Sequence, residues 1–240
     1  MKTTVINLSG NTGKTTLSKH LLAPQLNARR IEIEDVNTGD GEADLDLAAS
    51  KFKALAAELN VADDDEHFVI DIGASNAKTM IEHFAQLKST RAAIDFWIIP
   101  VVPSAKQKTD SLNTVKTLLE IGVEPGRIVM ILNNITDIDS VSSDFTTILA
   151  TRKLGINVVD EVVLASEVFE MLKGRQESVF TLVESPPDFK ALKKAAREKN
   201  DAAALLEIGR QMVLQDMAES AAENLRSVFL ATPMAVASAT

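Results

Sequence analysis

A short glycine-containing segment near the amino terminus carries residue types suited to chemistry. It follows an apolar run over residues 3–8 and opens a helical pattern over 14–26, the setting that a phosphate-binding loop requires. Successive backbone N–H groups at a helix start attract phosphate oxygens, and glycines let the backbone curl around them. We call this segment the phosphate loop and expect all its residues to contact a nucleotide. It consists of Gly10, Asn11, Thr12, Gly13, Lys14, Thr15 and Thr16.

Two side chains of the phosphate loop have specific expected roles. Lys14 can reach the β- and γ-phosphates of a nucleotide, and the Thr15 hydroxyl can bind Mg²⁺. Leu8, however, stands where the pattern G-x-x-x-x-G-K-[ST] has its first glycine. The alternative is a glycine-rich turn in which Lys14 is merely solvated.

Two more polar residues follow apolar runs. Asp71 ends the run over residues 67–71, and a carboxylate there is costly to bury unless something uses it. We expect it in the Mg²⁺ shell, whereas the alternative is a cap on the helix that starts near Ser75. Asn133 follows the run over 127–132, and its amide can pair with a purine edge. A plain turn asparagine is the alternative for Asn133.

Short apolar runs alternate with helical patterns along most of the chain. Such strands predict an α/β fold, a doubly wound, mostly parallel sheet of about six or more strands with helices on both faces. Ligands bind these sheets at the carboxyl ends of the strands, where the phosphate loop, Asp71 and Asn133 fall. The runs lie at residues 3–8, 30–34, 67–71, 94–102, 127–132 and 156–164, and the helical patterns at 14–26, 44–60, 76–89, 104–121 and 143–153.

The chain divides into three expected parts. Residues 1–186 should form the nucleotide-binding domain, and residues 187–230, which show only helical patterns, a helical extension packed on it. The small residues of 231–240 predict a disordered tail.

The extension carries one cluster of basic residues. Lys190, Lys193, Lys194 and Arg197 repeat at i, i+3, i+4 and i+7, so they share one helix face. They could bind DNA phosphates in a salt-dependent manner without sequence preference. The alternative is an ordinary solvated face of an amphipathic helix.

The composition excludes several classes of site. The chain has 240 residues, no cysteine, three histidines and a net charge of −9. Without cysteine there is no disulfide framework, thiolate metal site or cysteine nucleophile. The negative charge restricts nucleic-acid contact to a local basic patch or a basic partner. We expect a cytoplasmic protein, because no apolar run reaches the roughly 18 residues of a membrane span and no signal peptide precedes the first run.

These motifs together resemble the ParA/MinD group of phosphate-loop ATPases. The similarity covers roughly residues 1–182 and includes the run 98–104, which ends in Pro-Val-Val-Pro-Ser, and the strand that leads to Asn133. Residues 167–169 and 177–179 are similar to a late helix and turn of the group. Within the group the chain is most similar to plasmid stability proteins of the StbB type, which are encoded beside conjugation genes.

The resemblance implies that the chain binds ATP with Mg²⁺, hydrolyses it slowly and switches its affinity for a partner, a DNA-binding adaptor protein. It also implies a homodimer and a role in plasmid stability, partition or positioning. Lys14 and Asp35 become the expected catalytic residues. Asp35 is included because the family has an aspartate after its second strand that positions the attacking water. Glu34 fits the same family position in another register.

The phosphate loop departs from the family at two positions. Ser9 replaces a signature lysine that, in the family, crosses the dimer interface to the partner's nucleotide, and Asn11 replaces a glycine. Nucleotide binding should survive, because Gly13, Lys14 and Thr15 are kept. The shared-nucleotide dimer and hydrolysis are less strongly implied.

Two other functions fit the same residues. Ser9 and the two registers of the acidic segment favour a nucleotide-dependent binding module with little or no hydrolysis. A biosynthetic ligase on the same fold is the second alternative. Assembly ATPases that hold a metal cluster through cysteines are excluded, because the chain has none.

Overall fold

A computed structural model describes residues 1–33, 41–63 and 65–238. Within these residues, six strands form one sheet in the order β2-β3-β1-β4-β5-β6. All neighbouring strands pair in parallel, which confirms the predicted fold class. The strands are β1 (Lys2–Val5), β2 (Arg29–Ile33), β3 (Phe68–Ile72), β4 (Phe96–Val101), β5 (Ile128–Leu132) and β6 (Asn157–Val158).

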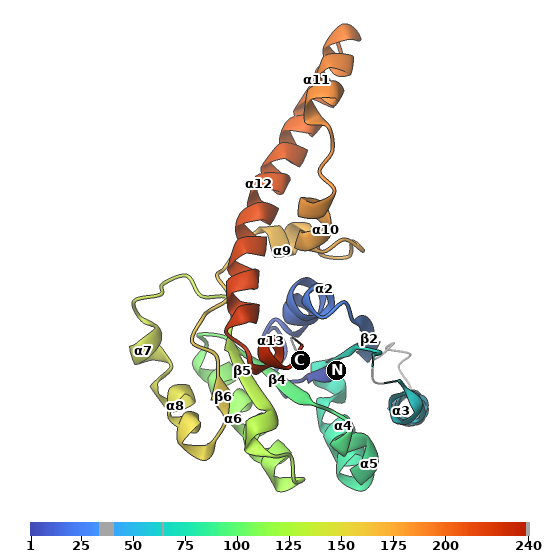
Figure 1. The fold of residues 1–240 in the computed structure, drawn as a ribbon, viewed down its shortest axis with the longest axis vertical. Helices are drawn as coiled ribbons and strands as arrows, with labels where there is room; N and C mark the ends of the chain where they lie inside the picture. Colours follow the sequence, from blue (N-terminus) through green and yellow to red (C-terminus); the bar gives the residue numbers. More distant parts are fainter. Residues whose placement is uncertain (34–40, 64, 239–240) are drawn as a thin grey trace.

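Helices cover both faces of the sheet (Figure 1). The helical segments in chain order are α1 (Lys14–Thr16), η1 (Leu17–Leu22), α2 (Ala23–Gln25), α3 (Gly41–Val61), α4 (Ala74–Gln86), α5 (Lys88–Ala92), α6 (Ala105–Glu120), η2 (Pro125–Arg127), α7 (Val141–Asp144), α8 (Thr146–Leu149), η3 (Ala150–Leu154), α9 (Val168–Met171), α10 (Val179–Glu184), α11 (Phe189–Glu198), α12 (Ala202–Leu230) and α13 (Pro233–Ala237).

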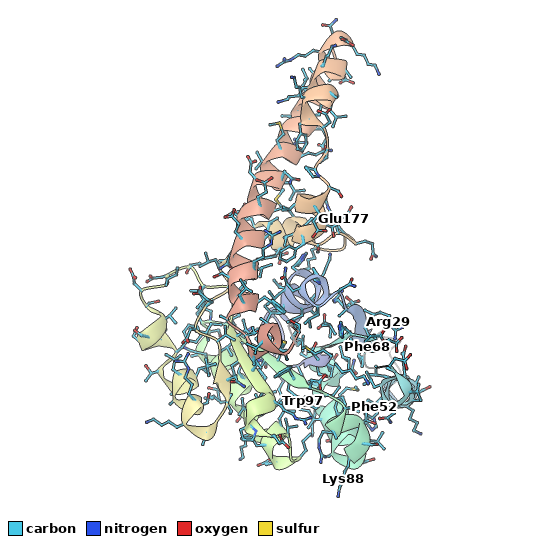
Figure 2. All side chains as sticks on the ribbon, viewed as in Figure 1. Arg29, Phe52, Phe68, Lys88, Trp97 and Glu177 are labelled. Carbon is cyan, nitrogen blue, oxygen red and sulfur yellow. The ribbon has the colours of Figure 1, made fainter. Side chains whose placement is uncertain are left out.

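Each face of the sheet has its own hydrophobic core. Alternate residues of a strand point to opposite faces, so Ile70 joins the core under α3, α4 and α6, while Val69 joins the core under η1 and α12. Trp97 is fully buried in the first core, where its ring packs edge-on against Phe84, 4.8 Å between centroids. Figure 2 shows Trp97 and Phe52 within this layer. By the same alternation, Asp71 faces the side of η1.

The helix after the phosphate loop runs continuously through α1, η1 and α2, as the pattern over 14–26 predicts. Its middle part, η1, is a π-helix, which the sequence pattern did not indicate. Pro24 has no N–H to donate and its ring clashes with a carbonyl one α-helical turn earlier, so a regular α-helix cannot continue through it. π-helical turns are rare in proteins, and those that occur are often found at functional sites.

The last predicted strand, over residues 156–164, is much shorter in the structure. Only Asn157 and Val158 form β6 at the sheet edge, and the chain returns to the sheet through a single bridge between Ile135 and Leu164. Between them, Asp160 is exposed and pairs with Arg152, 2.5 Å between Nη2 and Oδ1. Apolar character alone does not reveal that this edge segment leaves the sheet.

The carboxyl-terminal helices form a hairpin that projects from the domain (Figure 1). The second half of α12 packs on the η1 face through residues such as Ala218, Ala222 and Leu225, all fully buried. The first half of α12 and α11 extend away from the sheet. In the described ranges, no helix combines the length and apolar character needed to cross a membrane.

The prediction of a disordered tail is wrong for residues 233–237, which form α13. Thr232 donates its hydroxyl to Phe229 O at 2.7 Å, and Pro233 then starts a helix at a position where its missing N–H costs nothing. Met234 is fully buried in the core of the η1 face, which anchors the helix. The small residues of this segment predict disorder, but the burial of Met234 keeps the segment helical.

Candidate nucleotide-binding site

The phosphate loop joins β1 to α1 at the carboxyl edge of the sheet and has two residues in the left-handed region. Asn11 has a φ of 54° and Gly13 a φ of 87°. A Cβ at Gly13 would overlap the Nδ2 atom of Asn133, which itself donates a hydrogen bond to Thr12 O at 3.0 Å. Gly13 is thus required both by its backbone conformation and by the close approach of Asn133.

Lys14 is turned back onto its own loop. Its side chain is buried, and Nζ donates to Ser9 O at 2.9 Å. Thr15 is exposed, and the buried Thr12 hydroxyl has no hydrogen-bond partner within the described residues. The loop therefore presents a cation, a hydroxyl and a helix start in one place, as the sequence predicts.

Helix α6 supports the loop in a way that sequence reasoning missed. Gln107 donates from Nε2 to the carbonyl oxygens of Gly10, at 2.8 Å, and Asn11, at 3.2 Å. These bonds satisfy two carbonyls of the phosphate loop and fix the loop against α6.

The same face of α6 also binds the residues that lead from β1 into the phosphate loop. Ser111 Oγ accepts from Asn7 Nδ2 at 2.8 Å, and Thr114 Oγ1 accepts from Leu8 N at 3.1 Å. Gln107, Ser111 and Thr114 lie at i, i+4 and i+7, so they form one stripe on the helix. A stripe of polar residues on a helix that was predicted to pack against the sheet is a sequence signal that could have indicated these contacts.

Asp71 is almost completely buried beside the loop helix. Its Oδ2 accepts from Ser18 Oγ at 2.7 Å and from Arg30 Nη2 at 2.7 Å. It does not cap α4, because the N-cap of that helix is Gly73 and has no side-chain cap bond. The alternative of a capping role is therefore wrong, whereas the magnesium role stays a prediction. Asp35 and Glu34 lie outside the described residues.

A pocket of about 680 Å³ opens over the phosphate loop and brings all its residues together with Asn133. Asp71 and Arg30 lie beside this pocket and not on its wall, whereas Glu32 of β2 lines it. The segment after β6 also lines the pocket, although sequence reasoning did not assign it to the site. Its lining residues include Leu164, Ser166, Phe169, Leu172 and Lys173.

Two residues of η1 connect the helix after the phosphate loop to this later segment. Lys19 donates from Nζ to Leu172 O at 3.2 Å and to Arg175 O at 2.5 Å. Burial, together with the Arg30 charge, lowers the pKa of Lys19. His20 Nδ1 accepts from Val179 N at 3.3 Å, which leads directly into α10.

His20 should make the protein sensitive to acid. Burial, reinforced by the charges of Lys19 and Arg30, lowers its pKa from 6.5 to about 4. As the pH falls, the unfolded chain therefore takes up a proton first. The stability that comes from neutral His20 is complete above pH 6.5 and is lost progressively toward pH 4.

We expect the free energy of unfolding of the wild type to fall by up to about 3 kcal/mol over this window because of His20 alone. Urea unfolding between pH 4 and 7 measures it, with His20→Gln as the reference, since glutamine can accept from Val179 N and does not titrate. The other histidines, His67 and His83, are present in both proteins, so the comparison isolates His20. Equal pH slopes in the two proteins would contradict the prediction.

The basic cluster lies far from this pocket, on α11 in the projecting hairpin (Figure 1). Lys190, Lys194 and Arg197 are exposed and Lys193 is half-buried, while Lys194 approaches Glu198 at 4.0 Å. The helix and the shared face are as predicted. Contact with DNA stays a prediction.

No protein-family model matches the chain, and no curated protein sequence matches it. Two solved structures of McdA from Cyanothece are similar to it. Apo McdA is 16% identical over 75% of this chain and 92% of that chain, with a TM-score of 0.47. An ATP complex of an McdA variant is 16% identical over 75% of this chain and 89% of that chain, with a TM-score of 0.44. At this level of similarity, the function must be inferred from the site's own residues.

Proposed function

We propose that this chain binds ATP with Mg²⁺ at the phosphate loop and acts as an ATPase of the ParA/MinD type. The observation that carries the proposal is the loop's position: it connects β1 to a helix at the carboxyl edge of a parallel sheet and lines a pocket of about 680 Å³. Backbone N–H groups at such a helix start favour the negative charge of a triphosphate.

The residues around the loop fit this ligand. Lys14 would exchange Ser9 O for phosphate oxygens, and Thr15 would hold Mg²⁺ with Asp71. Within the described residues, no group of three or more histidines or carboxylates could hold a metal ion by itself. Magnesium does not need one, because it takes one or two protein ligands together with phosphate oxygens and water. When bound, it would neutralise charge on the triphosphate.

We further propose that the nucleotide state sets affinity for a DNA-bound adaptor protein, in plasmid stability, partition or positioning, with a link to conjugation. The protein would act in the cytoplasm as a homodimer, and hydrolysis, with Asp35 positioning the water, would reset it. The basic cluster on α11 would add a weak contact with DNA phosphates. Lys19 donates to Leu172 O, and Val179 N, at the start of α10, donates to His20. These bonds support a physical link between the pocket and the chain that leads to the hairpin.

A binding module with little or no hydrolysis is the second candidate, and the surroundings of Ser9 favour it. Ser9 is buried, its N–H donates to Asn7 Oδ1 at 2.9 Å, and its carbonyl accepts from Lys14. The position of the family's signature lysine therefore holds a short side chain packed in its own loop. It supplies no cation to the nucleotide of a partner chain.

Binding and turnover assays on the full chain test these proposals. We expect a fluorescent ATP analogue to bind in the presence of Mg²⁺, and labelled ATP to be hydrolysed slowly, with and without mixed-sequence duplex DNA. Binding without turnover in every condition would favour the module over the ATPase. No binding of ATP or GTP at millimolar concentration would refute both candidates.

A further inference from the structure

The strongest feature that the proposed roles leave unused is an arginine beside Asp71. Arg30 of β2 donates from Nη2 to Asp71 Oδ2 at 2.7 Å and from Nε to Ser18 Oγ at 2.9 Å. Ser18 in turn donates to the same Oδ2 atom, which closes a triangle of hydrogen bonds. A carboxylate that is 3% exposed is thereby held in place and neutralised by one guanidinium.

The same guanidinium has a second acid within reach. Arg30 Nη2 also pairs with Glu32, whose side chain is half exposed and lines the nucleotide pocket. Arginine can contact two carboxylates at once because its donors lie in a rigid planar fork. Arg30 can therefore release Asp71 to a cation and remain paired with Glu32, so the guanidinium itself is not left unpaired.

The adjacent residue shows that this placement is specific. Arg29 lies on the other face of β2, where its guanidinium stacks over Phe68, 5.0 Å from the ring centroid, and pairs with Glu58. Figure 2 shows Arg29 and Phe68 together. Two neighbouring arginines thus differ in one respect that matters here, contact with Asp71.

We propose that Arg30 is a positioning residue that competes with Mg²⁺ for Asp71 and so sets the Mg²⁺ concentration at which ATP binds tightly. The proposal rests on the proposed nucleotide site. While Arg30 pairs with Asp71, the carboxylate offers a cation no net charge. When Arg30 shifts its pairing to Glu32, the ionised Asp71 carboxylate becomes available to Mg²⁺.

The test measures binding of a fluorescent ATP analogue while Mg²⁺ is titrated from chelated to millimolar concentration. In Arg30→Gln, the Mg²⁺ concentration for half-maximal binding should fall about ten-fold, since Mg²⁺ no longer has to displace a guanidinium from Asp71. Arg29→Gln is the matched control and should leave that concentration unchanged. In an Asp71→Asn background, Arg30→Gln should have no further effect, because the group for which it competes is already neutral.

Thermal unfolding without nucleotide shows whether each variant folds. If Arg30→Gln does not fold, Arg30→Lys decides the question: it keeps the charge but loses the fork, so the Mg²⁺ requirement should fall about two- to three-fold. An unchanged requirement in a folded Arg30 variant overturns the proposal. Failure of the wild type to bind ATP at any Mg²⁺ concentration refutes the proposed function instead, so the two failures are distinguishable.

Discussion

Replacing Lys14 with methionine is expected to weaken ATP binding by about 10- to 150-fold, the equivalent of one charged hydrogen bond of about 1.5–3 kcal/mol. Lys14 lies inside the phosphate loop with its Nζ 2.9 Å from Ser9 O, and we expect it to turn from that carbonyl to a phosphate oxygen. Methionine keeps the apolar stem, which is buried, and removes the charge. Titration of a fluorescent ATP analogue measures the loss.

Lys116→Met is the matched control for this variant. Lys116 is exposed and approaches Glu120 at the end of α6 that is remote from the loop, so its loss should leave ATP affinity unchanged. Both variants should unfold at nearly the wild-type temperature when no nucleotide is present. Wild-type affinity in Lys14→Met would mean that the lysine is only a structural part of the turn, and the nucleotide site would have to be abandoned.

The sequence predicts the sheet and the phosphate loop well because both depend on local patterns. Residues 67–71 form one short run rich in apolar residues, and in the structure β3 covers Phe68–Ile72 with every residue buried. Gly13 and Lys14 follow the first strand directly, so their place at its carboxyl end follows from the topology of parallel sheets.

The partners of these residues could not be predicted, since they depend on which side chains meet across the sheet. Asp71 was expected to face a metal, yet Arg30 reaches it from the neighbouring strand, because the register places Glu32 opposite Asp71 and Arg30 two residues before it. Asn133 holds Thr12 O through its amide, a contact that was not foreseen, and its contact with a purine stays a prediction. Gln107 supports the loop from α6, a contact for which no residue was proposed from the sequence.

The contact between Asn133 and the loop leads to a second large effect. Gly13→Ala should destabilise the protein by about 2–5 kcal/mol, the sum of a left-handed backbone at a residue with a Cβ and of overpacking in a tight site. The new Cβ would overlap Asn133 Nδ2, and this amide cannot retreat without losing its bond to Thr12 O. Urea unfolding measures the change, and nucleotide binding should weaken with it because the loop must shift.

Gly10→Ala is the matched control within the same loop. Nothing lies within 4 Å of a Cβ at Gly10, and its φ is not in the left-handed region, so we expect a change of less than about 1 kcal/mol. Asn133→Ala separates the two causes at Gly13, because it removes the overlap and leaves the backbone strain. The double variant should therefore lose less stability than the sum of the single variants. Strict additivity would mean that Asn133 does not restrict Gly13, and that the loop is shaped by backbone conformation alone.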